Sequence, residues 1–298
     1  MRYFVIKAEK VTKKYSHRPG IEDISFEVEP GEIFGLLGND HAGKSTLVSL
    51  LAGYFRPNSG NLMVFGLDSQ RESRQIRERC GFFPGNYPAP SRLTVAELLR
   101  AEGHQPGGML WTEIQKLTDQ LDLDLAQPAA TLSTHDRQVF DLLQAFIPRP
   151  ELLILDEPTY ELTPAIQDVF YRLIAEARQD GRTVFITSRS LAEMERICDR
   201  VAIMHRGRLV AVERGIQLRS RAIRVVEMRF ADAVSKDGFA EIPNIRNLTV
   251  EGNKLRCVLQ GEPDRLIKTA CQHHITDLLS TQPSLEQVLA DTYGIKTI

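Results

Sequence analysis

Long apolar runs are absent from this chain of 298 residues. No run approaches the roughly 20 consecutive apolar residues that span a bilayer, so we expect that the chain does not cross a membrane by itself. Its beginning, MRYFVIKAEK, alternates apolar and charged side chains. A signal peptide has a basic and then an apolar segment, so this start predicts a first strand and a cytoplasmic location.

The chain also has few cysteines and only a small excess of negative charge. The four cysteines form no CxxC pair and have no histidines at metal-ligand spacing, which favours buried free thiols over zinc sites or disulfides. They are Cys80, Cys198, Cys257 and Cys271. The formal net charge is only −2, which gives no general attraction to nucleic acid, so no nucleic-acid partner is expected.

What is present is the composition of a globular chain, with 42% hydrophobic and 26% charged residues, long enough for a large and a small domain. Strand-like and helix-like segments alternate through about Val212, which predicts an α/β domain over residues 1–215. Residues 70–146 are mostly helical in character and predict a helical subdomain inserted into it. The segments IRVVEMRF, IRNLTVEG and KLRCVLQ then predict a small α+β domain over residues 222–298.

Continuous apolar runs predict strands buried on both faces of a parallel sheet, in LLILDEP, TVFITS and RVAIMHRGRLVAV. The last of these contains a tight Arg206-Gly207 turn. It therefore predicts an antiparallel hairpin at the edge of the sheet.

The segment GNDHAGKST matches the phosphate-binding pattern GxxxxGK[ST] and lies between a strand-like run and a helix-like run. Backbone amides of the loop would hold a β-phosphate, Lys44 would reach the β and γ oxygens, and Ser45 would bind Mg²⁺. The predicted nucleotide-binding residues of this segment are Gly38, Asn39, Asp40, His41, Ala42, Gly43, Lys44, Ser45 and Thr46.

Two carboxylates end the apolar run LLILDEPT. Asp156 stands at the carboxyl end of the predicted strand, where ligands bind in open α/β sheets, and Glu157 follows it. Asp156 suits a contact to Mg²⁺, directly or through water, and Glu157 suits polarisation of an attacking water. Carboxylates at the end of a buried strand are costly unless a cation or a helix end receives them.

With these motifs, residues 1 to about 212 resemble the nucleotide-binding subunit of ABC transporters. The ending QPSLEQVLADTYG is similar to that of export-type, ABC-2-like ATPases. The resemblance implies an α/β fold of the P-loop NTPase type, a mixed sheet with an inserted helical subdomain, followed by a small α+β accessory domain. Tyr15 matches the aromatic residue that stacks on adenine in this family, although a strand aromatic packed in the core is the alternative.

The resemblance also implies cofactors, partners and a location. The cofactors are ATP and Mg²⁺. The partners are an integral membrane permease subunit and a second ABC cassette, in a homodimer or a heterodimer. The chain would then lie at the inner face of the cell membrane as a peripheral protein.

The chain departs from the family at the signature LSGGQ, which closes over ATP bound to the opposing subunit. The aligned residues are Leu132, Ser133, Thr134, His135 and Asp136. A Cβ at positions 134 and 135 obstructs the approach of backbone amides to phosphate, and the Asp136 carboxylate repels it. The favoured interpretation is that Asp136 caps the following helix; an electrostatic barrier to phosphate is the alternative.

Five further positions differ from the family pattern, one of them Asp40, where the family prefers asparagine. Gly85 replaces the Mg²⁺-sensing glutamine or glutamate, Thr163 replaces an aspartate, and Arg189 aligns with the switch histidine. Arg189 either contacts a γ-phosphate, a third candidate catalytic contact beside Lys44 and Glu157, or is a surface arginine. His41 replaces a glycine and is tolerated where its φ is negative.

Three functions follow from this sequence. The first is the ATP-hydrolysing subunit of an exporter, weak alone and paired with a cassette whose signature is intact. The second is a module that binds ATP, hydrolyses it feebly and has a regulatory or structural role. The third, a soluble ABC ATPase acting on nucleic acid or ribosomes, is disfavoured because the chain has no long coiled-coil insertion and no second cassette.

Overall fold

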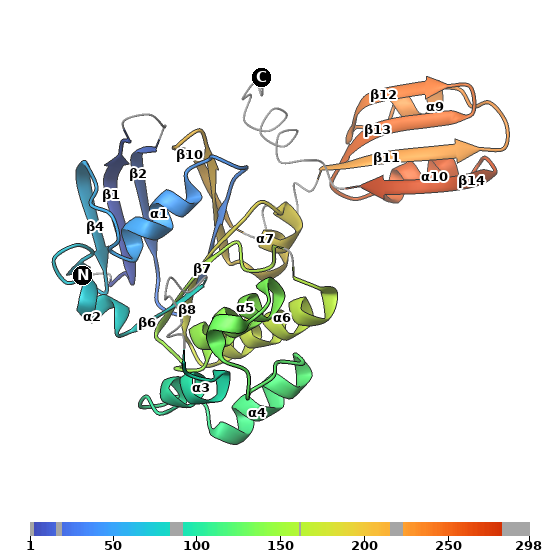
Figure 1. The fold of residues 1–298 in the computed structure, drawn as a ribbon. Helices are drawn as coiled ribbons and strands as arrows, with labels where there is room; N and C mark the ends of the chain where they lie inside the picture. The colour runs from blue at the N-terminus through green and yellow to red at the C-terminus, as the bar shows by residue number, and fades with distance from the viewer. Residues whose placement is uncertain (1–2, 16–19, 84–91, 161, 215–222, 282–298) are drawn as a thin grey trace. The chain divides into compact units, whose positions relative to one another are not determined.

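The computed structural model describes residues 3–15, 20–83, 92–160, 162–214 and 223–281, and the chain divides into two compact units, Met1–Glu213 and Arg214–Ile298 (Figure 1). Among the described residues, none of the helices combines the length and the apolar character needed to span a bilayer.

A four-stranded sheet with the order β2-β1-β4-β5 begins the first unit. It comprises β1 (Ile6–Lys13), β2 (Ile21–Val28), β4 (Ser59–Val64) and β5 (Leu67–Asp68). The neighbouring strands are antiparallel throughout. The strand predicted near the start of the chain is therefore confirmed, but it belongs to a separate sheet that the sequence patterns did not predict.

The second sheet of this unit has six strands in the order β10-β9-β3-β8-β7-β6. They are β3 (Ile33–Leu37), β6 (Cys80–Phe83), β7 (Leu152–Asp156), β8 (Thr183–Ser188), β9 (Arg200–His205) and β10 (Arg208–Arg214). The five strands from β9 to β6 are parallel. Arg206 and Gly207 both have positive φ, of 47° and 78°, as a tight hairpin turn between β9 and β10 requires. The predicted parallel strands and edge hairpin are confirmed.

Helix α1 (Lys44–Leu51) contacts β4 of the first sheet and β7 of the second, and so lies between them (Figure 1). Its residues Leu47, Leu50 and Leu51 are completely buried in a core shared with both sheets, and each contributes about 1.5–3 kcal/mol by its burial. The helix ends at Leu51, and Gly53 shortly after it has a φ of 74°, a conformation that does not continue a helix.

The first unit has further helices among its described residues. They are α2 (Ser73–Arg77), α3 (Val95–Gly103), α4 (Trp111–Gln120), α5 (Thr134–Phe146), α6 (Pro164–Gln179) and α7 (Leu191–Ile197), with a short 3₁₀ turn at Ala129–Thr131. Helix α5 contacts β6, and α6 contacts β8. Strand β6 lies within the range predicted for the helical subdomain, so the helical segment itself begins at α3.

The described residues of the second unit form a four-stranded antiparallel sheet, in the order β12-β13-β11-β14, and two helices. Its elements are β11 (Ile223–Phe230), α9 (Asp237–Ala240), β12 (Ile245–Glu251), β13 (Lys254–Gln260), α10 (Asp264–Ala270) and β14 (Ile275–Thr281). This is the βαββαβ arrangement of the ferredoxin-like fold. Leu255, Cys257 and Leu259 are buried on one face of β13, as their alternation predicts.

The cysteines carry no disulfide. Cys198 and Cys257 are buried, as predicted, and Cys80 is half-buried. The prediction of a buried thiol is wrong for Cys271, which lies exposed directly after α10.

Candidate functional site

The predicted phosphate loop, Gly38–Thr46, joins the end of β3 to the start of α1. Lys44 is the first residue of the helix and only 4% exposed, because its side chain folds back beneath the loop. Its Nζ donates hydrogen bonds to the carbonyl oxygens of Gly38, at 2.6 Å, and Asn39, at 3.0 Å. The loop therefore holds one buried cation in a fixed position.

The start of α1 is open to an anion. Gly43 precedes the helix with a φ of 104°, and a Cβ there would lie 2.7 Å from a methyl carbon of Ile21, so only glycine fits. Among the described residues, no side chain caps this end and no acidic residue lies in its first turn. The first amides of a helix have no partner within the helix, so this end suits a phosphate group.

His41 adopts a conformation that side chains other than glycine rarely take. Its φ is 63°, so the condition on which a bulky residue was expected to be tolerated here, a negative φ, is not met. The side chain is exposed, and the turn therefore accommodates it without a clash against the core.

The two predicted carboxylates lie at the carboxyl end of β7, beside this loop. The Glu157 carboxylate lies 3.0 Å from the Nζ of Lys44, and Glu157 is 24% exposed. Asp156 is half-buried and accepts a hydrogen bond from the hydroxyl of Thr187. The fold thus brings a cation from the loop and a carboxylate from another strand into contact.

Arg189, just beyond β8, joins this group. Its guanidinium contacts the Glu157 carboxylate at 3.0 Å and the Asp40 carboxylate at 3.1 Å, and lies 4.0 Å from the ring centroid of Tyr160. A hydrogen bond with Tyr160, followed by the charges of Glu157 and Asp40, raises the pKa of Arg189. Arg189 is therefore not an isolated surface arginine but a bridge between the phosphate loop and the β7 carboxylate.

Tyr15 lies elsewhere on the same unit. Its ring packs edge-on against Phe55, with a centroid separation of 6.0 Å, and the Nζ of Lys13 lies 5.6 Å from its centroid. Tyr15 is half-buried and Phe55 is 43% exposed, so this pair is not part of the apolar core that the alternative interpretation required. Stacking of adenine on Tyr15 stays a prediction.

The residues aligned with the family signature form the start of α5. Ser133 is the N-cap: its Oγ accepts a hydrogen bond from the Asp136 amide at 3.1 Å and donates one to the Asp136 carboxylate at 2.7 Å. The interpretation that Asp136 caps this helix is therefore wrong, because Ser133 does so. Asp136 still places its negative charge in the first helical turn, where the helix dipole favours it. Thr134 and His135 are exposed between them.

Two other departures from the family pattern have different outcomes. Thr163 is the N-cap residue of α6, makes no capping hydrogen bond with its side chain, and is followed by Pro164 in the first turn. Gly85 lies outside the described residues.

Sequence reasoning missed two groups behind the site. Thr187, near the end of the mainly apolar strand β8, contacts both Asp156 and Glu157. Glu193 on α7 is 6% exposed, and its Oε2 accepts a hydrogen bond from Ser188. Its Oε1 is buried and has no hydrogen-bond partner among the residues that the structure describes. Burial raises the pKa of the Glu193 carboxyl. The polar ending of the run TVFITS was the available signal for Thr187.

The described residues contain no cluster of three or more histidine, cysteine, aspartate or glutamate side chains that could hold a metal alone. Ser45 is exposed at the start of α1 and Asp156 is half-buried at the end of β7. Mg²⁺ commonly takes one or two protein ligands together with substrate phosphates. These two residues therefore fit a metal that arrives with a nucleotide.

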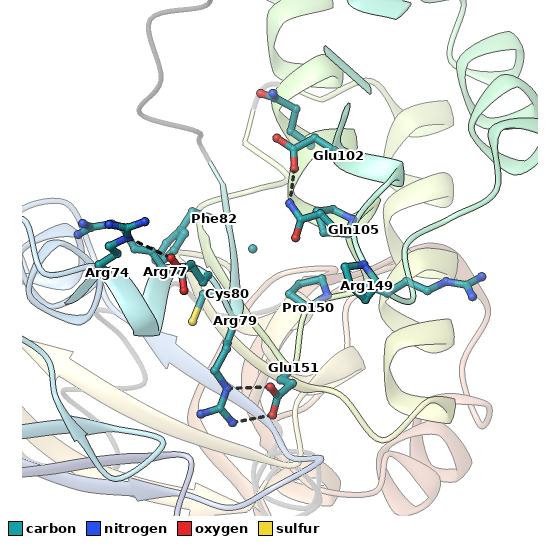
Figure 2. A pocket seen from close by; sticks show the side chains of 15 residues that line it. Arg74, Arg77, Arg79, Cys80, Phe82, Glu102, Gln105, Arg149, Pro150 and Glu151 are labelled. Carbon is teal, nitrogen blue, oxygen red and sulfur yellow. Dashed lines mark hydrogen bonds and ion pairs between the residues drawn. The ribbon is translucent and has the colours of Figure 1, made fainter. Parts of the chain in front are cut away.

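A cavity of about 700 Å³ lies at the opposite edge of the six-stranded sheet, where β6 and β7 begin (Figure 2). Figure 2 shows the ion pair between Arg79 and Glu151 on one side of it and the hydrogen-bonded Glu102 and Gln105 on another. The phosphate loop and Asp156 lie at the carboxyl ends of the strands, so this cavity is not part of the candidate site.

Comparison with known proteins identifies relatives of this chain. A family model described as ABC transporter matches residues 21–160. Nod factor export ATP-binding protein I of Rhizobium meliloti (strain 1021) is 30% identical over 97% of this chain and 88% of its own length. Linearmycin resistance ATP-binding protein LnrL of Bacillus subtilis (strain 168) is 27% identical over 97% of this chain and 98% of its own.

Solved structures resemble the fold. The structure of an ATP binding subunit of an ABC transporter matches with a TM-score of 0.64 and 26% identity, over 72% of this chain and 92% of that chain. A dimeric bacterial ABC transporter cassette matches with a TM-score of 0.60 and 20% identity, over 70% and 98%. The second likeness concerns the fold alone.

Proposed function

This chain belongs to the ABC transporter family of ATP-binding subunits, and on that premise we propose that it binds MgATP and powers or gates a separate membrane subunit of an export complex. The mixed α/β fold of an ABC cassette agrees with the fold class predicted from the sequence. ABC cassettes bind ATP, generally with Mg²⁺, and are generally ATPases, so ATP hydrolysis is the activity to test.

The observation that carries this proposal is the contact of 3.0 Å between Lys44 and Glu157. These residues come from two elements far apart in the sequence, α1 and the end of β7. Their meeting beside an uncapped helix start combines a buried cation, free amides and a carboxylate in one place. That combination fits a nucleoside triphosphate and its metal.

Each residue has a proposed role. The amides of residues 38–46 and the Lys44 ammonium bind the phosphates, while Ser45 and Asp156 hold Mg²⁺, Asp156 directly or through water. When bound, Mg²⁺ neutralises charge on the phosphate oxygens. Glu157 orients and polarises the attacking water, for which it must exchange its contact with Lys44 for one with that water.

Arg189 is proposed to contact the γ-phosphate. Its planar guanidinium suits phosphate oxygens and already lies within 3.1 Å of Asp40 in the phosphate loop. In the same nucleotide, the adenine ring is proposed to stack on Tyr15.

The start of α5 supports pairing with a second, more standard cassette. A glycine signature offers free amides to the phosphate of the opposing subunit, whereas here the Ser133 hydroxyl and the Asp136 carboxylate already occupy the helix end. We propose that a partner signature completes the site around Lys44, while the site that uses Ser133 to Asp136 holds ATP without efficient turnover.

The relatives support an export role. One is a Nod factor export ATP-binding protein and another is a linearmycin resistance ATP-binding protein. We propose only the class of complex for this chain, and not its cargo. That class is an export complex with an integral membrane permease, in which this chain lies at the inner face of the membrane. Residues 1–215 would be the ATP-binding domain and residues 222–298 the accessory domain.

One observation favours a second candidate function, an ATP-binding module with feeble hydrolysis. Glu157, the proposed catalytic carboxylate, is paired with two cations, Lys44 and Arg189. If Arg189 retains this pairing after nucleotide binds, the carboxylate is not available to a water molecule, and the chain would regulate a partner by binding ATP alone.

Steady-state ATP hydrolysis separates the two candidates. The chain is assayed alone and after co-expression with a second cassette and a permease in membrane vesicles, with Glu157→Gln as the matched inactive variant. The first candidate predicts weak turnover alone and a rise on reconstitution that Glu157→Gln removes. Binding of ATP without any rise supports the second candidate, and no binding of ATP contradicts both.

A further inference from the structure

Thr187 lies at the end of β8 in register with Asp156 on the neighbouring parallel strand β7. It is completely buried, although the rest of the strand that precedes it is mainly apolar. A buried hydroxyl must find hydrogen-bond partners. The register places the hydroxyl of Thr187 beside Asp156 and the residue that follows it, Glu157.

The Thr187 hydroxyl is used in both directions. It donates its hydrogen to Oδ1 of Asp156, at 2.5 Å, and accepts the amide N–H of Glu157, at 3.1 Å. A hydroxyl has one hydrogen to donate and lone pairs to accept with, so both bonds are made at once. One side chain is therefore bonded to both residues of the carboxylate pair.

Glu157 needs such support because its backbone φ is 48°, in the left-handed region. A residue other than glycine in this conformation persists only where its surroundings hold it. Its amide is held by the Thr187 hydroxyl and also by the Thr187 carbonyl, at 3.2 Å. This backbone conformation accompanies the contact of the Glu157 carboxylate with Lys44, at 3.0 Å.

We propose that Thr187 is a positioning residue: its hydroxyl fixes the Asp156 carboxylate for Mg²⁺ and the backbone turn of Glu157 for its water. The inference rests on the proposed function, because it assigns a purpose to the orientation of these two carboxylates. Threonine suits the task, since its branched Cβ restricts the side-chain rotamer and so aims the hydroxyl.

The test compares full-length variants by titration with a fluorescent ATP analogue, once with Mg²⁺ and once with EDTA. Thr187→Val keeps the shape and removes the hydroxyl, while Thr187→Ser keeps the hydroxyl. Thr183→Val is the matched control: Thr183 lies at the other end of β8, is 2% exposed, and its hydroxyl accepts the Gly31 amide at 3.0 Å.

The inference predicts that Thr187→Val lowers affinity in Mg²⁺ on the order of tenfold, the loss of a hydrogen bond to a charged group, with affinity in EDTA unchanged. Thr187→Ser restores most of the Mg²⁺-dependent affinity, and Thr183→Val changes neither value although it lowers stability. If Thr187→Val does not fold, Thr187→Ala removes the same hydroxyl with less bulk.

Three results overturn the inference in different ways. If the wild-type chain gains affinity from Mg²⁺ and Thr187→Val gains as much, Thr187 does not position the metal carboxylate and only this inference fails. If Thr183→Val changes the Mg²⁺ dependence equally, the effect is one of stability and the inference also fails. If the wild-type chain binds no nucleotide in either condition, the proposed function fails and the inference with it.

Discussion

The guanidinium of Arg189 lies 3.0 Å from a carboxylate oxygen of Glu157, so the position aligned with a switch histidine is ion-paired with the proposed catalytic carboxylate. The same guanidinium also reaches Asp40 of the phosphate loop. A histidine could release this contact by losing a proton near neutral pH, whereas arginine keeps its charge. Contact of the Arg189 guanidinium with phosphate is therefore the change that would release Glu157 from this ion pair.

Arg189→Ala is expected to lower ATP affinity about tenfold while ADP affinity changes less, because only ATP has the γ-phosphate that the guanidinium would contact. Isothermal titration calorimetry with both nucleotides measures this. Arg189→Lys, which keeps the charge but loses the planar fork, should show an intermediate loss. Equal losses for ATP and ADP would mean that Arg189 does not contact the γ-phosphate.

Lys44→Ala is expected to weaken ATP binding on the order of a hundredfold, because the buried ammonium supplies charge-assisted hydrogen bonds to the phosphates. Lys116→Ala, which removes an exposed lysine of α4, is the control and should bind ATP normally. Equilibrium binding of a fluorescent ATP analogue measures both variants. Unchanged affinity in Lys44→Ala would remove this loop as the nucleotide site.

Ser133→Ala is expected to lower the free energy of unfolding by about 1 kcal/mol, because it removes the N-cap of α5. Asp136→Ala should cost less, about 0.5 kcal/mol, since it loses mainly a favourable charge near the helix start. Urea denaturation of both variants and the double variant measures these values. The double variant should cost less than the sum, because the two side chains bond each other. A larger cost for Asp136→Ala would restore Asp136 as the main capping group.

The buried Glu193 carboxyl predicts a pH dependence of stability. Burial raises its pKa above the ordinary value of 4.5, so the folded chain holds this proton more tightly than the unfolded chain does. Its contribution to stability is present below about pH 4.5 and is lost as pH rises through the raised pKa. Glu193→Gln should therefore gain stability relative to the wild type as pH increases, measured by urea denaturation from pH 5 to 8.

Glu151→Gln is the control, because the stability contribution of the Glu151 carboxylate changes with pH in the opposite direction. Arg79 binds the Glu151 carboxylate with two hydrogen bonds of 2.7 Å and lowers its pKa. That contribution is present at neutral pH and is lost as pH falls through the lowered pKa, so the variant should be less stable than the wild type at neutral pH, with a gap that closes in acid. A constant gap between Glu193→Gln and the wild type at every pH would contradict the assignment for Glu193.

Patterns local in sequence predicted the elements around the site well. The glycine-rich loop lies between a strand and a helix, and the apolar run before Asp156 is a buried parallel strand. Both patterns report a physical requirement that a few neighbouring residues satisfy by themselves. The meeting of Lys44 with Glu157 also follows, because the carboxyl ends of parallel strands lie at one edge of a sheet.

The features that could not be predicted depend on tertiary register. Thr187 reaches Asp156 only because β7 and β8 pair with these residues opposite each other. The positive φ of His41 depends on the turn that the whole loop adopts. At the start of α5, a serine and an aspartate three residues apart are both good caps, and only the backbone geometry selects Ser133.

The exposure of Cys271 gives the chain one thiol that a reagent in solution can reach. Thiolates rather than thiols are nucleophilic, and burial raises the pKa of Cys80 and of Cys198, and raises that of Cys257 to about 11. Cys271 is the exposed cysteine, so a maleimide dye at neutral pH should modify it preferentially without mutagenesis. Such a dye would report on the ferredoxin-like unit while nucleotide is added to the native chain.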